Sequence, residues 1–153
     1  MKTILYIFYH HLCIDGLLSS AVTDSYVRNC GEYDVVINKA YTTGSNDFLT
    51  YDYIEKFDKK SDYKLVFFFV DCLPGYDTII SILKKKIPIH IFDHHKTSID
   101  TLSELEIEMP DEYEKYIFNN CTEKMSGCGI CWNYFYGNQP HLKNALVTLI
   151  QDR

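Results

Sequence analysis

The feature that most constrains the fold is an apolar run, Lys64-Leu-Val-Phe-Phe-Phe-Val70, that ends directly at Asp71. A short run of this kind without polar alternation is typical of a strand buried on both faces, as in a parallel sheet covered by helices. A second such run spans Thr3–Tyr9, and a shorter third one spans Pro88–Phe92. Each of the three is followed at once by acidic or histidine side chains.

Segments of helical character separate these runs. We expect helices over Gly16–Arg28, Thr50–Lys59, Tyr76–Lys86, Ser126–Tyr136 and His141–Ile150, and further strands over Tyr33–Tyr41 and Tyr116–Asn119. The stretch Thr97–Glu108 is mixed and acidic. Strands that alternate with helices favour βαβ units. The sequence therefore predicts an α/β fold with a mostly parallel sheet of about five strands and helices on both faces.

Length, charge and cysteine usage narrow the classes of function. The chain has 153 residues, the size of one domain, and a net charge of -6. We therefore do not expect a large basic surface that grips duplex nucleic acid. No secretory signal is visible, and no apolar run approaches the ~20 residues of a membrane span. The six cysteines are scattered and do not form the pattern of a disulfide framework, so we expect a cytoplasmic protein with reduced thiols.

Candidate ligands follow the apolar segments at four places. They are His10-His11-Leu-Cys-Ile-Asp15-Gly16, Asp71, Asp93-His94-His95, and Asp152 after the apolar helix end Leu146–Ile150. Parallel sheets place their chemistry at the carboxyl ends of the strands, so these side chains should converge. Aspartate and imidazole suit Mn²⁺ and Mg²⁺. Two such ions about 3.5–4 Å apart can polarise a phosphoryl group and activate the attacking water.

Each piece taken alone has a simpler explanation. A lone aspartate after a strand is most often a helix N-cap, which is the alternative for Asp71. A lone histidine in a loop is more often a surface or core residue. The joint pattern favours a metal site, because such residues end the most apolar strands in order. Cys128-Gly-Ile-Cys131 could be half of a zinc site or a redox pair, but two buried small residues in a helix are the favoured interpretation.

These residues resemble the DHH phosphoesterase superfamily, which includes RecJ-type exonucleases, nanoRNA-degrading phosphatases and family II inorganic pyrophosphatases. The resemblance covers essentially the whole chain and is carried by Tyr9–Gly16, Val70-Asp71, Phe92–His95 and, more weakly, Ser126–Trp132 with Asp152-Arg153. Many members have a His-x-Asp-x-Asp-Gly first motif. Here Cys13 stands where the first Asp would be, which resembles a branch with Tyr-His-x-x-Cys-x-Asp-Gly.

The resemblance also implies a role for each residue. Two Mn²⁺ or Mg²⁺ ions would be bridged by Asp71 and bound further by His10, Asp15, His94 and Asp152, with His11 as the alternative to His10 because of the doublet. Asp93 would orient a histidine ring, and His95 would contact the phosphate or protonate the leaving oxygen. The implied activity is hydrolysis of phosphoesters, in short single-stranded oligonucleotides or nucleotide-like substrates, by in-line attack of a metal-bound hydroxide. A pyrophosphatase is not favoured, because that branch has Asp at the position of Cys13.

Two departures from the family pattern support an alternative from another class. Family members usually continue into a smaller C-terminal domain that grips the substrate, whereas this sequence stops one residue after Asp152. Cys13 also leaves one metal site with a softer or missing ligand. We therefore expect residues 1–153 to be a DHH-type phosphoesterase domain without that second domain. A catalytically weak metal-binding or interaction domain derived from the same fold is the alternative.

Overall fold

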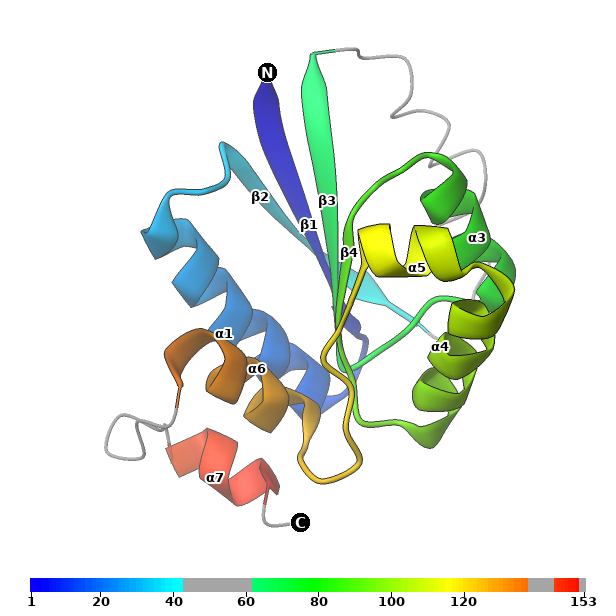
Figure 1. Ribbon diagram of the computed structural model, residues 1–153. Helices are drawn as coiled ribbons and strands as arrows, with labels where there is room; N and C mark the ends of the chain where they lie inside the picture. Colours follow the sequence, from blue (N-terminus) through cyan, green and yellow to red (C-terminus); the bar gives the residue numbers. More distant parts are fainter. Residues whose placement is uncertain (43–61, 138–144, 152–153) are drawn as a thin grey trace.

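The strands of the protein form one parallel sheet. The computed structural model describes residues 1–42, 62–137 and 145–151. The strands are β1 (Lys2–His10), β2 (Val35–Tyr41), β3 (Tyr63–Val70), β4 (Ile89–Phe92) and β5 (Ile117–Asn119). They lie in the order β2-β1-β3-β4-β5, and every neighbouring pair is parallel (Figure 1). The predicted parallel sheet of about five strands is confirmed.

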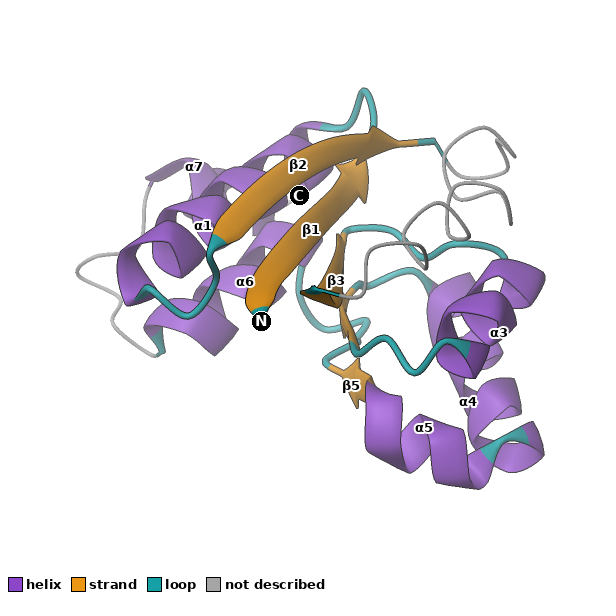
Figure 2. Cartoon of the chain, turned by 90° about the horizontal axis from the view of Figure 1, so that it is seen from above, coloured by secondary structure: helices purple, strands orange, loops and turns teal. Residues whose placement is uncertain are grey.

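Helices cover both faces of the sheet. They are α1 (Ile14–Cys30), α3 (Tyr76–Lys84), α4 (Lys96–Glu108), α5 (Pro110–Tyr116), α6 (Gly127–Tyr136) and α7 (Ala145–Gln151). Viewed from above, α1, α6 and α7 lie on one side of the strands, and α3, α4 and α5 lie on the other (Figure 2). The α/β class and the placement of helices on both faces are therefore also confirmed.

Alternate side chains of β3 enter two separate hydrophobic cores. Phe67 and Phe69 pack in the core beneath α3 and α4, while Val66, Phe68 and Val70 pack in the core beneath α1 and α6. All five are buried. Full burial of one such side chain contributes roughly 1.5–3 kcal/mol. The uninterrupted apolar run in the sequence therefore reflects a central strand that has no face towards solvent.

Several element boundaries differ from the predicted ones. Helix α1 begins two residues earlier than expected, at Ile14, and ends at Cys30, where the left-handed backbone of Gly31 (φ 71°) caps it. Helix α4 forms over the mixed acidic stretch. Helix α5 was not predicted, because it is charged and buries no residue, although Pro110 begins it and acidic residues occupy its first turn. The helix predicted over residues 50–59 and the start of the one predicted from residue 141 lie outside the described residues.

The strand order creates a switch point between β1 and β3. From β1 the chain continues to β2 on one side, whereas β4 and β5 follow β3 on the other. Ligands of doubly wound sheets bind outside the carboxyl ends of the strands at such a point. Tyr9 pairs with Val70 and Val70 pairs with Phe92. His10 follows Tyr9, Asp71 follows Val70 and Asp93 follows Phe92, so the register of the strands places these three residues side by side.

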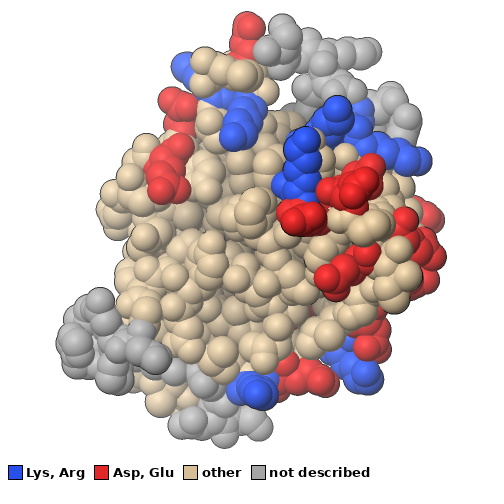
Figure 3. All heavy atoms as spheres, viewed as in Figure 1, with Lys and Arg blue, Asp and Glu red and all other residues tan. Residues whose placement is uncertain are grey.

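The surface carries charges of both signs. On the face in Figure 3, acidic and basic side chains are intermixed over the right-hand side, where α3, α4 and α5 lie, and much of the rest is uncharged. Within the part of the chain that the structure describes, no helix combines the length and apolar character needed to cross a membrane.

Candidate metal centre

Asp71 lies at the centre of the candidate site. It follows β3 with a left-handed backbone (φ 58°), and its N–H donates to the carbonyl of Phe92 at 2.8 Å, which extends the sheet by one bond. Its side chain is 1% exposed, yet neither carboxylate oxygen accepts a hydrogen bond. A buried carboxylate without donors is costly, and a bound cation would remove that cost. The alternative that Asp71 caps a helix is wrong, because α3 begins at Tyr76 and Gly75 occupies its N-cap.

Two histidines flank the Asp71 carboxylate. His10 Nδ1 lies 3.5 Å from Oδ2, and His94 Nε2 lies 3.2 Å from Oδ1. His10 Nδ1 is itself buried without a hydrogen-bond partner. The Asp71 carboxylate raises the pKa of His94, and burial opposes that shift. His11 is exposed and donates its backbone N–H to Tyr41 at 2.8 Å, so the fold places His10, and not His11, beside Asp71.

Asp93 holds the ring of His95. It is fully buried, and its Oδ1 accepts bonds from the backbone N–H of His94 at 2.8 Å and from His95 Nδ1 at 2.7 Å. Its Oδ2 accepts the Ser98 hydroxyl at 2.5 Å. A carboxylate only accepts, so His95 carries its proton on Nδ1 and its Nε2 is left for another partner. Ser98 was missed by sequence reasoning, because nothing in the sequence separates it from other helix serines.

Asp15 joins the site to α6. Its two oxygens accept the backbone N–H groups of Gly127 at 2.8 Å and Cys128 at 2.7 Å, which open that helix. A helix N-terminus favours a carboxylate. Asp15 Oδ2 also lies 3.7 Å from His94 Nε2. Each carboxylate oxygen has a further lone pair, so the two backbone bonds leave Asp15 able to bind a cation. The Gly127 and Cys128 amides were not identified from the sequence, where this segment gave only the weakest motif match.

Two glycines allow the elements of the site to approach closely. A Cβ added to Gly16 would lie 2.5 Å from the carbonyl oxygen of His10, so the first turn of α1 can rest against the end of β1 only without a side chain there. A Cβ added to Gly127 would lie 2.8 Å from the Asp71 side chain. These contacts explain why glycine stands in the Asp15-Gly16 and Ser126-Gly127 pairs.

Two groups of ligand atoms share Asp71. One consists of Asp71, Asp93, His94 and His95, the other of His10, Cys13 and Asp71, and within each the ligand atoms lie within 4.8 Å of one another. Carboxylates and imidazoles in this number suit a divalent cation. Burial raises the pKa of the Cys13 thiol, the Asp71 carboxylate adds to that shift, and the Gly16 N–H opposes it. The predicted ligand Asp152 lies outside the described residues.

The Cys128-Gly-Ile-Cys131 segment lies within α6. Both cysteines are buried, free, and part of the core beneath α1 and α6. Neither belongs to a ligand group among the described residues. The structure therefore agrees with the interpretation of these two cysteines as packing residues.

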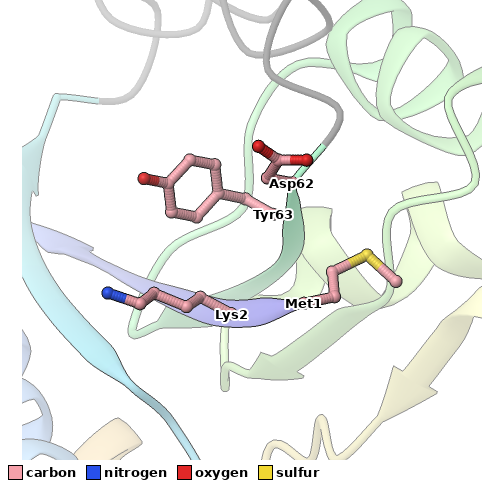
Figure 4. A pocket seen from close by; sticks show the side chains of 4 residues that line it. All are labelled: Met1, Lys2, Asp62 and Tyr63. Carbon is pink, nitrogen blue, oxygen red and sulfur yellow. The ribbon is translucent and has the colours of Figure 1, made fainter.

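A surface hollow of about 530 Å³ lies away from these groups. It is lined by Met1, Lys2, Asp62 and Tyr63, at the amino ends of β1 and β3 (Figure 4). His10 and Asp71 lie at the opposite ends of the same strands. The hollow contains one carboxylate, that of Asp62, which belongs to no ligand group within the described part of the chain. We therefore place the candidate site at the carboxyl ends of the strands.

Comparison with known proteins supports the fold. No protein-family model matches the sequence, and no similar sequence was found among curated proteins. A solved structure of an uncharacterised protein from Helicobacter pylori G27 is similar over 97% of this chain, with a TM-score of 0.65 and 12% sequence identity. The matched region is 41% of that protein, so this chain spans about two fifths of its length. At that identity the similarity concerns the parallel α/β architecture, and the buried Asp/His cluster is a property of this chain.

Proposed function

We propose that the protein is a divalent-metal-dependent phosphoesterase whose centre is built around Asp71. The observation that carries the proposal is the buried Asp71 carboxylate, which lies between His10 and His94 and accepts no hydrogen bond. It stands at the β1–β3 switch point, where an open α/β sheet binds its ligands. A carboxylate placed there is suited to bridge two cations.

The neighbouring residues would complete the binding of two Mn²⁺ or Mg²⁺ ions. His10, Asp15 and His94 offer nitrogen and oxygen atoms close to Asp71. Asp152 remains a predicted further ligand. Divalent cations bound here would stabilise the charge of a phosphoryl group and lower the pKa of a coordinated water.

His95 would act on the substrate directly. Asp93 fixes its ring through Nδ1, and Ser98 fixes Asp93 in turn. When the ring also carries a proton on Nε2, that atom can donate it to a phosphate oxygen or to the leaving oxygen. Its ring lies near the other two histidines, at 4.5 Å from His94 and 5.8 Å from His10 between centroids.

The substrate class rests on the resemblance to the DHH phosphoesterase superfamily. The motif segments Tyr9–Gly16, Val70-Asp71 and Phe92–His95 are the ones that bear these side chains. Short single-stranded oligonucleotides or nucleotide-like phosphoesters are the substrates that this resemblance favours. The net charge of -6 agrees with a small substrate held at a cation site rather than a duplex held by a basic surface.

Hydrolysis by the metal-free and metal-loaded chain tests the proposal. The full chain is freed of metal with a chelator, and release of p-nitrophenol from bis(p-nitrophenyl) phosphate and cleavage of 5′-phosphorylated dinucleotides are measured with Mn²⁺ or Mg²⁺. We expect activity with a cation that is lost in Asp71→Asn. The matched control is Asp77→Asn, which changes an exposed aspartate of α3 and should keep the activity.

A metal-binding domain without catalysis is the second candidate. The observation that favours it is Cys13, a softer ligand within the group that contains His10 and Asp71. Cation binding by the wild type without hydrolysis of either phosphoester would favour this candidate. Absence of both binding and hydrolysis would contradict both.

A further inference from the structure

We propose that Cys13 binds a cation as a thiolate together with His10 and Asp71, and that this three-ligand group takes a thiophilic divalent ion of the zinc class. The inference rests on the proposed metal centre and adds which kind of ion one half of it selects. It also assigns a positive role to the residue at which the first motif departs from the common pattern.

The geometry is that of a partly assembled site with three protein ligands. His10 Nδ1 and Asp71 Oδ2 lie 3.5 Å apart, and the Cys13 sulfur lies within 4.8 Å of a ligand atom of each of these two residues. Zinc bonds of ~2.0–2.3 Å in tetrahedral geometry separate neighbouring ligand atoms by ~3.3–3.6 Å. The His10–Asp71 pair already has this separation, and a small side-chain movement would bring the sulfur in. Three protein ligands leave the fourth position open, as in catalytic zinc sites.

The two residues that would bind the cation together with Cys13, His10 and Asp71, have ligand atoms that make no hydrogen bond in the metal-free protein. His10 Nδ1 and both oxygens of Asp71 are buried without a hydrogen-bond partner. A protonated thiol can donate to one carboxylate oxygen at most, so it cannot satisfy the whole set. One cation bound among the three residues would supply a partner for the nitrogen, the sulfur and the carboxylate together.

The fold fixes the sulfur at this place. Cys13 is the N-cap residue of α1, and the close contact of Gly16 with the His10 backbone holds the first turn of that helix against the end of β1. The Cys13 sulfur therefore stands at a helix N-terminus, where a thiolate is stabilised. The remaining cysteines, which are Cys30, Cys72, Cys121, Cys128 and Cys131, belong to no ligand group among the described residues.

The two ligand groups around Asp71 differ in chemical preference. Thiolate and imidazole favour zinc-class ions, whereas carboxylates favour manganese and magnesium. The other group consists of Asp71, Asp93, His94 and His95, which offer oxygen and nitrogen atoms alone. Cys13 would therefore make the centre asymmetric. A subsite that prefers thiophilic ions would lie next to one rich in oxygen ligands, and the two subsites would share the Asp71 carboxylate.

Cobalt spectroscopy on the full chain tests this assignment. The metal-free protein, kept reduced with a phosphine that binds cations weakly, is titrated with Co²⁺. A cobalt–thiolate bond adds a charge-transfer band in the near ultraviolet, which nitrogen and oxygen ligands do not produce. We expect this band in the wild type and in Cys30→Ser, which changes an exposed cysteine. We expect its loss in Cys13→Ser, with Zn²⁺ affinity at least ~10-fold weaker. In Cys13→Asp, Mn²⁺ should gain relative to Zn²⁺.

A measurement on the unmodified chain covers the case in which Cys13→Ser does not fold. Alkylation followed by peptide mass spectrometry should modify Cys13 much less with Zn²⁺ than without metal, whereas modification of the exposed Cys30 should stay the same. Cobalt binding without the thiolate band, or equal alkylation of Cys13 with and without Zn²⁺, would overturn the role of Cys13 while leaving the Asp71 centre intact. If no divalent ion binds the wild type, both this inference and the proposed function fail.

Discussion

Replacing Asp71 by alanine should change stability in opposite directions with and without metal. The metal-free wild type keeps a buried carboxylate whose two oxygens accept no hydrogen bond, and an unsatisfied buried polar group costs ~1–3 kcal/mol. Alanine removes that cost but must adopt the left-handed backbone of this position (φ 58°), which costs ~1–2 kcal/mol. The difference runs from ~1 kcal/mol destabilising to ~2 kcal/mol stabilising, so its centre predicts a metal-free variant slightly more stable than the wild type. Asp71→Asn, which tolerates this backbone, serves as the companion variant.

With metal, the order should reverse. A cation at 100 times its dissociation constant stabilises the folded wild type by ~2.7 kcal/mol, which for a chain of this size raises the melting temperature by ~5–11 °C. The Asp71→Ala variant should lose most of this gain, because the proposed bridging carboxylate would serve both ions. Paired melting curves with chelator and with Mn²⁺ measure both arms. A variant that is destabilised without metal, and that still gains fully from Mn²⁺, would refute the role given to Asp71.

The other predictions concern the support of the site and its pH response. Ser98→Ala removes one hydrogen-bond donor from the buried Asp93 and should lower the free energy of unfolding in urea by ~1–3 kcal/mol. The control Ser103→Ala, at an exposed position of the same helix, should lower it by less than ~0.5 kcal/mol, and equal losses would contradict the buried bond. Gly16→Ala would set a methyl group 2.5 Å from the last carbonyl of β1 and should destabilise the chain by ~1–3 kcal/mol; an unchanged urea midpoint would show that α1 is not held that closely. Burial lowers the pKa of His90 from 6.5 to about 4, so the unfolded chain binds the extra proton first. The contribution of neutral His90 to the free energy of unfolding should therefore be complete above pH 6.5 and decrease by ~1–2 kcal/mol as the pH falls towards 4. The His90→Phe variant should lose less stability over this range, and identical pH profiles for the variant and the wild type would disprove the prediction.

The sheet could be predicted because its strands are buried on both faces. The runs at Thr3–Tyr9 and Lys64–Val70 have no polar alternation, and few structures other than a covered central strand accommodate them. Helix α5 could not be predicted in the same way. Its seven residues bury no side chain, so no apolar pattern marks it, and its start at Pro110 and acidic first turn are weak local signals.

Part of the candidate site was predictable from strand ends alone. His10, Asp71 and Asp93 each stand at or directly after the end of a parallel strand, and adjacent carboxyl ends meet at one edge of the sheet. The contacts of Asp15 were not predictable, because its partners are backbone amides more than a hundred residues away. Backbone donors carry no residue-type signal. Cys13 was identified as a departure from a motif, but its distance to His10 and Asp71 required the fold.

The bonds from Asp15 to the start of α6 also set an order of events during synthesis. Residues 15 and 127 are 112 positions apart, so more than a hundred further residues must leave the ribosome before this carboxylate finds its partners. The amino-terminal strands emerge first and can begin to pair. Until residue 128 has emerged, the Asp15 carboxylate lacks its two backbone donors. Selection of a cation would then begin only after the start of α6 has been synthesised.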